Sequence, residues 1–260
     1  MRAQPGTRNG RHPGWAALAV GLALVSAGAA PSEAAPAWIK RALGVKDAGA
    51  GRTVALPAVA HYRVDEGGGF ILDRSERHSL LKFDDDPEIW VLTSTRGPRG
   101  DLIFTNDAGE VMLRTTRLGG ATVFTPQRPD GAAATVIGPA ASLRLATLGP
   151  SGLYQRLLLA SSRASRAAGR LIGFEAPDAD PTSDGLIADT ALVSSDAVVK
   201  FARRRGGRQA LAYVARVEIV RATRPSCWYR SGIVTIAVAP QLGLAGRPSS
   251  SLIQTAFIRH

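Results

Sequence analysis

Short apolar runs separated by turn residues follow one another through the first half of the chain. Each run is short and rich in residues typical of β-strands. The segments between them are rich in Gly, Asp and Asn, as in 65–68, 96–100 and 106–109. The runs are Thr53–Val64, Gly69–Asp73, Leu80–Phe83, Glu88–Thr95, Asp101–Phe104, Glu110–Thr116, Ala121–Thr125 and Ala133–Ile137. Eight short strands at such regular spacing predict an antiparallel β sandwich or a partly closed barrel.

The period of the pattern changes after Pro150, where apolar residues recur every three or four positions. This spacing predicts an amphipathic helix that begins at Ser151. The apolar side of that helix would comprise Leu153, Leu157, Ala160, Ala164, Ala168 and Leu171.

The rest of the second half mixes helix and strand signals. A second helix is predicted from Asp184, which would cap its first turn, to the Arg203–Arg205 run before a Gly pair. The runs Tyr213–Arg221 and Ile233–Ala239 predict a β-hairpin, and a short terminal helix is expected from Ser249. The predicted class is therefore α+β: an N-terminal antiparallel β sandwich or partly closed barrel, then a C-terminal α+β half with two helices, a hairpin and a terminal helix.

The first 34 residues have the pattern of an export signal. A segment with three Arg precedes an apolar stretch, Trp15–Ser26, and small residues follow it. Cleavage after Ala29 or after Ala34 fits, and the second site is preferred. The apolar stretch is too short to span a hydrocarbon core of roughly 30 Å, so we expect no transmembrane helix in the mature chain. The predicted location is the periplasm or cell envelope.

The predicted organisation has four parts: a signal peptide (1–34), a linker (35–51), a β-rich domain (52–149) and a basic α+β domain (150–260). The last two parts differ in net charge. Residues 35–149 carry 14 basic and 13 acidic side chains, whereas residues 150–260 carry 15 basic and seven acidic ones. The cationic excess therefore lies in the C-terminal half, where it favours an anionic partner.

The arginines of this half follow the two predicted helices. Three of them recur every seventh residue on the first helix and form a stripe beside its apolar side, and three more end the second helix. If the two helices pack side by side, the groups extend one another. The anion-binding candidates are Arg156, Arg163, Arg170, Arg203, Arg204 and Arg205. Two simpler explanations of these arginines stay open. Cations in the last turn of a helix complement the helix dipole, which accounts for the Arg203–Arg205 run. Codon bias would also produce the excess of Arg over Lys.

No motif in the sequence indicates catalysis. There is no G-x-S-x-G, no H-E-x-x-H and no C-x-x-C. Cys227 has no arrangement of His or Asn around it and is interpreted as a structural thiol. Asp84, Asp86 and Glu88 would point the same way in an extended chain, as ligands of a hard cation do, but carboxylates at a strand start commonly face water. We therefore name no catalytic residue and expect neither a metal nor another cofactor.

One resemblance rests on longer stretches. They are the segment His61–Arg74, the pair Phe83-Asp84, the segment Leu118–Pro126 and the segment Gly246–Ser250. With these stretches the chain resembles an alphaproteobacterial family of exported proteins known only as a domain of unknown function. The resemblance covers most of the mature chain. It implies a location in the bacterial envelope and does not imply any activity.

Two hypotheses on function follow. The first is an exported, non-catalytic envelope protein whose basic half contacts a lipid headgroup, a cell-wall polymer or an acidic protein. Nucleic acid is not expected as a partner, because export separates the protein from it. The alternative is a periplasmic hydrolase whose site the fold assembles. Its candidate residues are His61, Asp73, His78, Asp84 and Asp86.

The export signal makes the first prediction. The protein isolated from an expressing bacterium should begin near Ala35, because basic, apolar and small residues succeed one another in the order that signal peptidase requires. Mass spectrometry of the intact chain measures this directly. A cytoplasmic chain that retains Met1–Ala34 would contradict it.

Overall fold

Eight antiparallel strands close into a barrel in the computed structural model, which describes residues 57–258. Each strand pairs with the next along the chain, and β1 also pairs with β8, so every strand has two neighbours. Their bounds are β1 Val59–Val64, β2 Gly69–Asp73, β3 Ser79–Phe83, β4 Ile89–Arg96, β5 Leu102–Thr105, β6 Val111–Thr115, β7 Ala121–Thr125 and β8 Arg128–Pro139. Of the two predicted architectures the barrel is the one present, and it is closed rather than partly closed. Closure leaves no strand edge unpaired.

Alternation along each strand fills the barrel. On β1, Ala60, Tyr62 and Val64 are buried while the residues between them are more exposed. Tyr62 stacks on Phe70 of β2 with ring centroids 4.8 Å apart. Leu72 and Leu81 are also fully buried. The buried side chains of each strand thus face the inside of the barrel.

Both long helices predicted in the second half are present. Helix α2 spans Pro150–Ala168 and helix α3 spans Asp184–Ala202. Short helices follow, α4 (Gly207–Leu211) and α5 (Ser250–Ala256), and a 3₁₀ segment, η2, spans Pro240–Gly246. Within residues 57–258, no helix is long and apolar enough to cross a membrane.

One residue of the predicted apolar side lies elsewhere. Helix α2 ends at Ala168 because Gly169 adopts a left-handed conformation with φ of 72°. Leu171 lies beyond that turn and is 78% exposed, so its assignment to the buried side of the helix was wrong.

The predicted hairpin is also corrected. Strand β10 (Arg216–Arg221) and strand β12 (Ile233–Val238) are neighbours, but they pair in parallel. The segment between them forms β11 (Ser226–Arg230), which is the antiparallel partner of β12. With β9 (Gly173–Glu175) the sheet has the order β11-β12-β10-β9. Central β12 is buried along most of its length and edge β11 alternates, which is how these two positions differ in a sheet.

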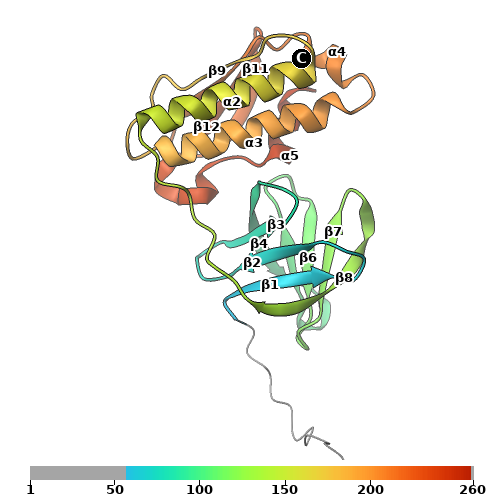
Figure 1. Ribbon diagram of the computed structural model, residues 1–260. Helices are drawn as coiled ribbons and strands as arrows, with labels where there is room; N and C mark the ends of the chain where they lie inside the picture. The colour runs from blue at the N-terminus through green and yellow to red at the C-terminus, as the bar shows by residue number, and fades with distance from the viewer. Residues whose placement is uncertain (1–56, 259–260) are drawn as a thin grey trace, which may run out of the picture. The chain divides into compact units, whose positions relative to one another are not determined.

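The sheet and the helices share a second core. Helices α2 and α3 lie side by side on one face of the sheet and run in the same direction (Figure 1). More than half of α3 is buried, and Ile187, Ala191 and Val198 pack with Val217 and Ile236 of the strands. A smaller apolar cluster joins Leu80 and Ile89 of the barrel to Leu244 of η2.

Candidate functional site

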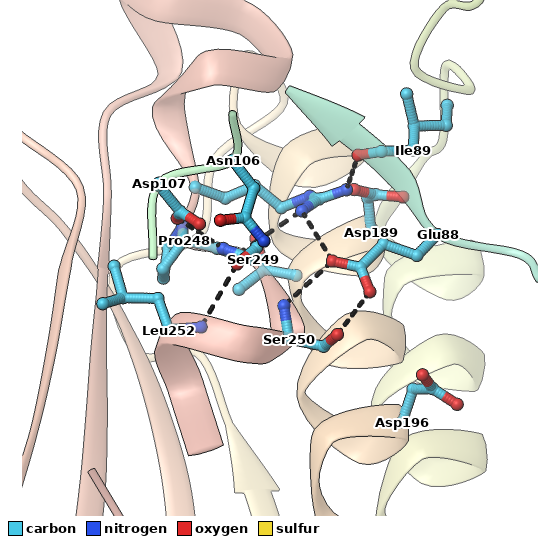
Figure 2. A network of polar contacts seen from close by, with 12 residues as sticks. Glu88, Ile89, Asn106, Asp107, Asp189, Asp196, Pro248, Ser249, Ser250 and Leu252 are labelled. Carbon is cyan, nitrogen blue, oxygen red and sulfur yellow. Dashed lines mark hydrogen bonds and ion pairs between the residues drawn. The ribbon is translucent and has the colours of Figure 1, made fainter. Parts of the chain in front are cut away.

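The most extensive polar cluster surrounds Glu88, the residue immediately before β4. Its side chain is 1% exposed. The backbone N–H of Ser250, at the start of α5, donates to Glu88 Oε1 over 2.9 Å, and the Ser250 hydroxyl donates to Oε2 over 2.5 Å (Figure 2). The barrel is thereby hydrogen-bonded to the first turn of the last helix.

Arg247 is the cation of this cluster and is 4% exposed. Its Nε donates to the carboxylate of Asp189 on α3, and its Nη2 donates to the carbonyl oxygen of Ile89 over 2.8 Å. Its Nη1 lies 3.8 Å from Glu88 Oε1. A buried guanidinium is stable only when its N–H donors are hydrogen-bonded. The partners of Arg247 come from β4, from α3 and from the chain before β4.

Ser249 completes the start of α5. Its hydroxyl accepts a hydrogen bond from the N–H of Leu252, which is the usual helix N-cap. Its own N–H donates to Asp107 Oδ2 over 2.8 Å, and Asp107 lies between β5 and β6 of the barrel (Figure 2). The segment Gly246–Ser250, which carries part of the family resemblance, therefore fastens α5 to the barrel at several points.

Lys200 of α3 lies on the other side of Glu88. Its Nζ is 3.0 Å from Asp86 Oδ2, 3.6 Å from Glu88 Oε2 and 2.6 Å from Asp196 Oδ2. Oxygens of these three carboxylates lie within 4.8 Å of one another, as metal ligands do. The ammonium group already occupies the place between them, so the cluster is an internal ion network.

The two titratable groups at its centre are perturbed. Burial raises the pKa of Glu88 to about 7, although Arg247, Lys200 and the hydrogen bonds from Ser250 act in the opposite direction. Burial alone would lower the pKa of Lys200, but Glu88, Asp196 and Asp86 together raise it above its ordinary value. Each group thus holds its proton more tightly than it would in water.

Asp84, Asp86 and Glu88 do not share one site, contrary to the extended-chain expectation. Asp86 and Glu88 turn to Lys200, whereas Asp84 Oδ2 lies 3.0 Å from Nε2 of His61 on β1. Gly69 makes that approach possible, because a Cβ on it would lie 2.6 Å from Asp84 Oδ2 and from the Tyr62 carbonyl oxygen. His61, Asp84 and the turn 67–69 line an open hollow of about 610 Å³.

The other hydrolase candidates lie apart from this hollow. His78 is exposed on the turn before β3. Asp73 is buried and accepts hydrogen bonds from Ser75 and from the backbone N–H of Leu143. Burial would raise the pKa of Asp73, but these hydrogen bonds hold it below its ordinary value. Of the five candidates the fold brings together only His61 and Asp84, and the residues lining the hollow include no Ser, Thr, Cys or Lys.

Cys227 lies on β11 and is half-buried. Its Sγ donates to the carbonyl oxygen of Leu252 in α5 over 3.5 Å, and the side chain packs against the second core. This environment fits the interpretation of Cys227 as a structural thiol.

Four of the six predicted anion-binding arginines gather at one end of the helix layer. Arg170 follows the end of α2, and Arg203, Arg204 and Arg205 follow the end of α3. All four are exposed. Because α2 and α3 run in parallel, their C-terminal ends meet on the same side (Figure 1).

The remaining two candidates lie elsewhere. Arg163 is partly covered and is 3.6 Å from Asp196 of α3. Arg156 is exposed on α2 but precedes Arg170 by fourteen residues, which is roughly 21 Å along a helix. The single stripe is therefore not formed, because α2 ends before Arg170 and Arg163 faces α3.

Three arginines that the sequence analysis missed join the four. Arg166 is in the last turn of α2, Arg208 is in α4, and Arg230 ends β11. We call Arg166, Arg170, Arg203, Arg204, Arg205, Arg208 and Arg230 the arginine end. Among residues 57–258 none of the seven forms an ion pair with a carboxylate. The sequence pattern leaves open both the parallel direction of the two helices and the positions of α4 and β11, so it gave no signal that these arginines gather.

The pKa of Glu88 makes a prediction about stability. A carboxyl group whose pKa is raised by folding binds its proton more tightly in the folded state. Its contribution to stability is complete below its unfolded pKa and is lost as the pH rises through about 7. From about pH 5 to about pH 8, the wild-type free energy of unfolding should therefore fall relative to that of Glu88→Gln.

Urea titrations across this pH range measure the difference. Glu76→Gln, on an exposed turn, is the control and should follow the wild type. Curves for Glu88→Gln and wild type that stay parallel over the whole range would contradict the raised pKa.

The comparisons with known proteins give one family match. No curated protein and no solved structure gives a significant match to the chain. A family model described as "Domain of unknown function (DUF4908)" matches residues 40–257. This match spans both cores, the His61–Asp84 pair, the Glu88–Arg247 network and the arginine end. The chain therefore belongs to the DUF4908 family of unknown function.

Proposed function

We propose that this protein is an exported, non-catalytic binding module that holds an anionic partner at the arginine end. The observation that carries the proposal is the gathering of seven exposed arginines at the ends of two parallel helices without a described carboxylate to neutralise them. Guanidinium groups bind phosphate and carboxylate through paired hydrogen bonds, so the shared chemistry of the partner is a dense array of such anions.

The distribution of acidic side chains supports this proposal. In the C-terminal half, Asp189 and Asp196 point into the ion network, and Asp180 pairs with Arg221. Asp184 opens α3 and is buried. These four acids lie along α3 or before it, and Glu175 pairs with Arg216, whereas the arginine end lies at and beyond the last turns of α2 and α3. Positive potential is therefore concentrated at one end of this half.

The helix dipole accounts for only part of this arrangement. A cation at the end of a helix gains roughly 0.3–1 kcal/mol from the dipole, and Arg166 in the last turn of α2 and Arg203 at the C-cap of α3 are placed for that effect. Arg208 and Arg230 lie on other elements. A surface built from α2, α3, α4 and β11 goes beyond what capping requires.

The hydrolase alternative has weaker support. His61 and Asp84 meet beside a hollow, yet the other three candidates are elsewhere and no Ser, Thr, Cys or Lys lines it. A hydrogen bond between the two side chains beside Gly69 is the simpler description of that pair.

Export belongs to the same proposal. It rests on the pattern of the first 34 residues, which lie outside the described part of the chain. In the periplasm or envelope, phospholipid headgroups, cell-wall polymers and acidic proteins all offer the anions that the arginine end requires.

The test compares two triple variants of the protein as isolated from an expressing bacterium. Arg170→Gln, Arg203→Gln and Arg205→Gln together should weaken binding to soluble polyphosphate and to phosphatidylglycerol vesicles about a hundredfold, because each arginine near an anionic surface contributes about 1 kcal/mol. Wild-type binding should also weaken as salt is raised. Co-sedimentation and titration measure both effects.

The control removes the same charge from the barrel. Arg77→Gln, Arg96→Gln and Arg117→Gln together alter three exposed arginines and should leave binding close to that of the wild type. If both triple variants weakened anion binding equally, binding would depend on the net charge of the protein and not on the arginine end, which would contradict the proposal. No binding by the wild type to either anion would end the proposal.

A further inference from the structure

Two large apolar side chains lie within the arginine end. Leu171 is 78% exposed and directly follows Arg170, and Tyr213 is 66% exposed and follows α4. The loops that carry them are adjacent, because Gly173 N–H donates to the Ala215 carbonyl oxygen over 3.1 Å. The turn after Arg230 joins them, since Ala215 N–H donates to the Gly232 carbonyl oxygen over 2.8 Å.

The exposure of Leu171 is imposed by its fixed neighbours. Gly169 turns the chain out of α2, and Ile172 is fully buried on the other side of Leu171. The Ile172 backbone is held at both polar groups: its N–H donates to Ser165 Oγ over 2.9 Å, and its carbonyl accepts from Ser161 Oγ over 2.7 Å. An apolar side chain held outward in this way is available to a partner without further ordering.

We propose that the arginine end docks on the surface of an anionic lipid bilayer, with Leu171 and Tyr213 entering the interface and the arginines contacting headgroup phosphates. This inference rests on the proposed function and names its partner. A soluble polyanion offers nothing to an exposed leucine, whereas a bilayer offers hydrocarbon beneath a layer of phosphate. Tyrosine suits that boundary because its ring is apolar and its hydroxyl is polar.

Both components are required by this geometry. One or two apolar side chains give only weak membrane affinity by themselves, and a polybasic patch adds the second contribution that makes attachment stable. Charge is therefore expected to govern binding to every polyanion, and the apolar pair is expected to govern binding to lipid alone.

The experiment uses the chain as isolated from an expressing bacterium and the double variant Leu171→Ser with Tyr213→Ser. Its matched control is Leu118→Ser with Tyr154→Ser, which removes one exposed leucine, 99% exposed on a barrel turn, and one tyrosine, 62% exposed on α2. Co-sedimentation with phosphatidylglycerol–phosphatidylcholine vesicles, titration with polyphosphate and the rise in surface pressure of a phosphatidylglycerol monolayer are the three measurements. Thermal unfolding verifies that each variant is folded.

The Leu171 and Tyr213 variant should lose roughly tenfold or more in vesicle affinity and should no longer raise the monolayer pressure, while polyphosphate binding stays unchanged. The control should behave as the wild type in all three. Unchanged vesicle binding by the Leu171 and Tyr213 variant, with normal polyphosphate binding, would overturn the lipid inference and leave the anion-binding proposal standing. Absence of binding to both vesicles and polyphosphate would overturn both. Wild-type binding to polyphosphate alone would assign the arginine end to a soluble polymer or an acidic protein instead.

Discussion

A buried guanidinium is the constraint on which the arrangement of the described chain depends. Arg247 is almost inaccessible to water and must find its hydrogen-bond acceptors inside the protein. They come from the carboxylate of Asp189 on α3 and from the carbonyl of Ile89 on the barrel strand β4, with Glu88 beside them. Removing any of these partners would leave a charge or a donor buried and unpaired. The barrel strand, helix α3 and the start of α5 are therefore held in one ion network.

The same network accounts for the charge on the surface. Asp189 and Asp196 are directed at Arg247 and Lys200, so the carboxylates of α3 are used inside the protein. The arginines that follow α2 and α3 have no comparable partners among the described residues. The cationic excess of the C-terminal half is thereby presented at one end. The turns at Gly169 and around residue 213 place apolar side chains within that end.

Local patterns in the sequence predicted the elements better than their contacts. Short apolar runs between turn residues located all eight barrel strands, and helical periodicity located α2 and α3, because both signals are set by neighbours within a few residues. The parallel pairing of β10 with β12 was not predicted, because the apolar pattern of two strands is the same whether they pair in parallel or antiparallel. The end of α2 before Leu171 depends on one glycine that a periodicity argument passes over. The contact of Glu88 with Ser250 joins residues 162 positions apart and leaves no local signal. The arginine end was predicted in part for the same reason: Arg170, Arg203, Arg204 and Arg205 were candidates from the sequence, whereas Arg166, Arg208 and Arg230 were recognised only in the fold.

Amide hydrogen exchange of the wild-type protein, with and without phosphatidylglycerol vesicles, tests the central claim most directly. It locates the contact without altering any residue. The account predicts that vesicles slow exchange in 166–172, 203–215 and 230–232, while exchange around His61 and Asp84 and in the Glu88–Arg247 network stays unchanged. Slowed exchange confined to the barrel, or no change anywhere along the described chain, would contradict it.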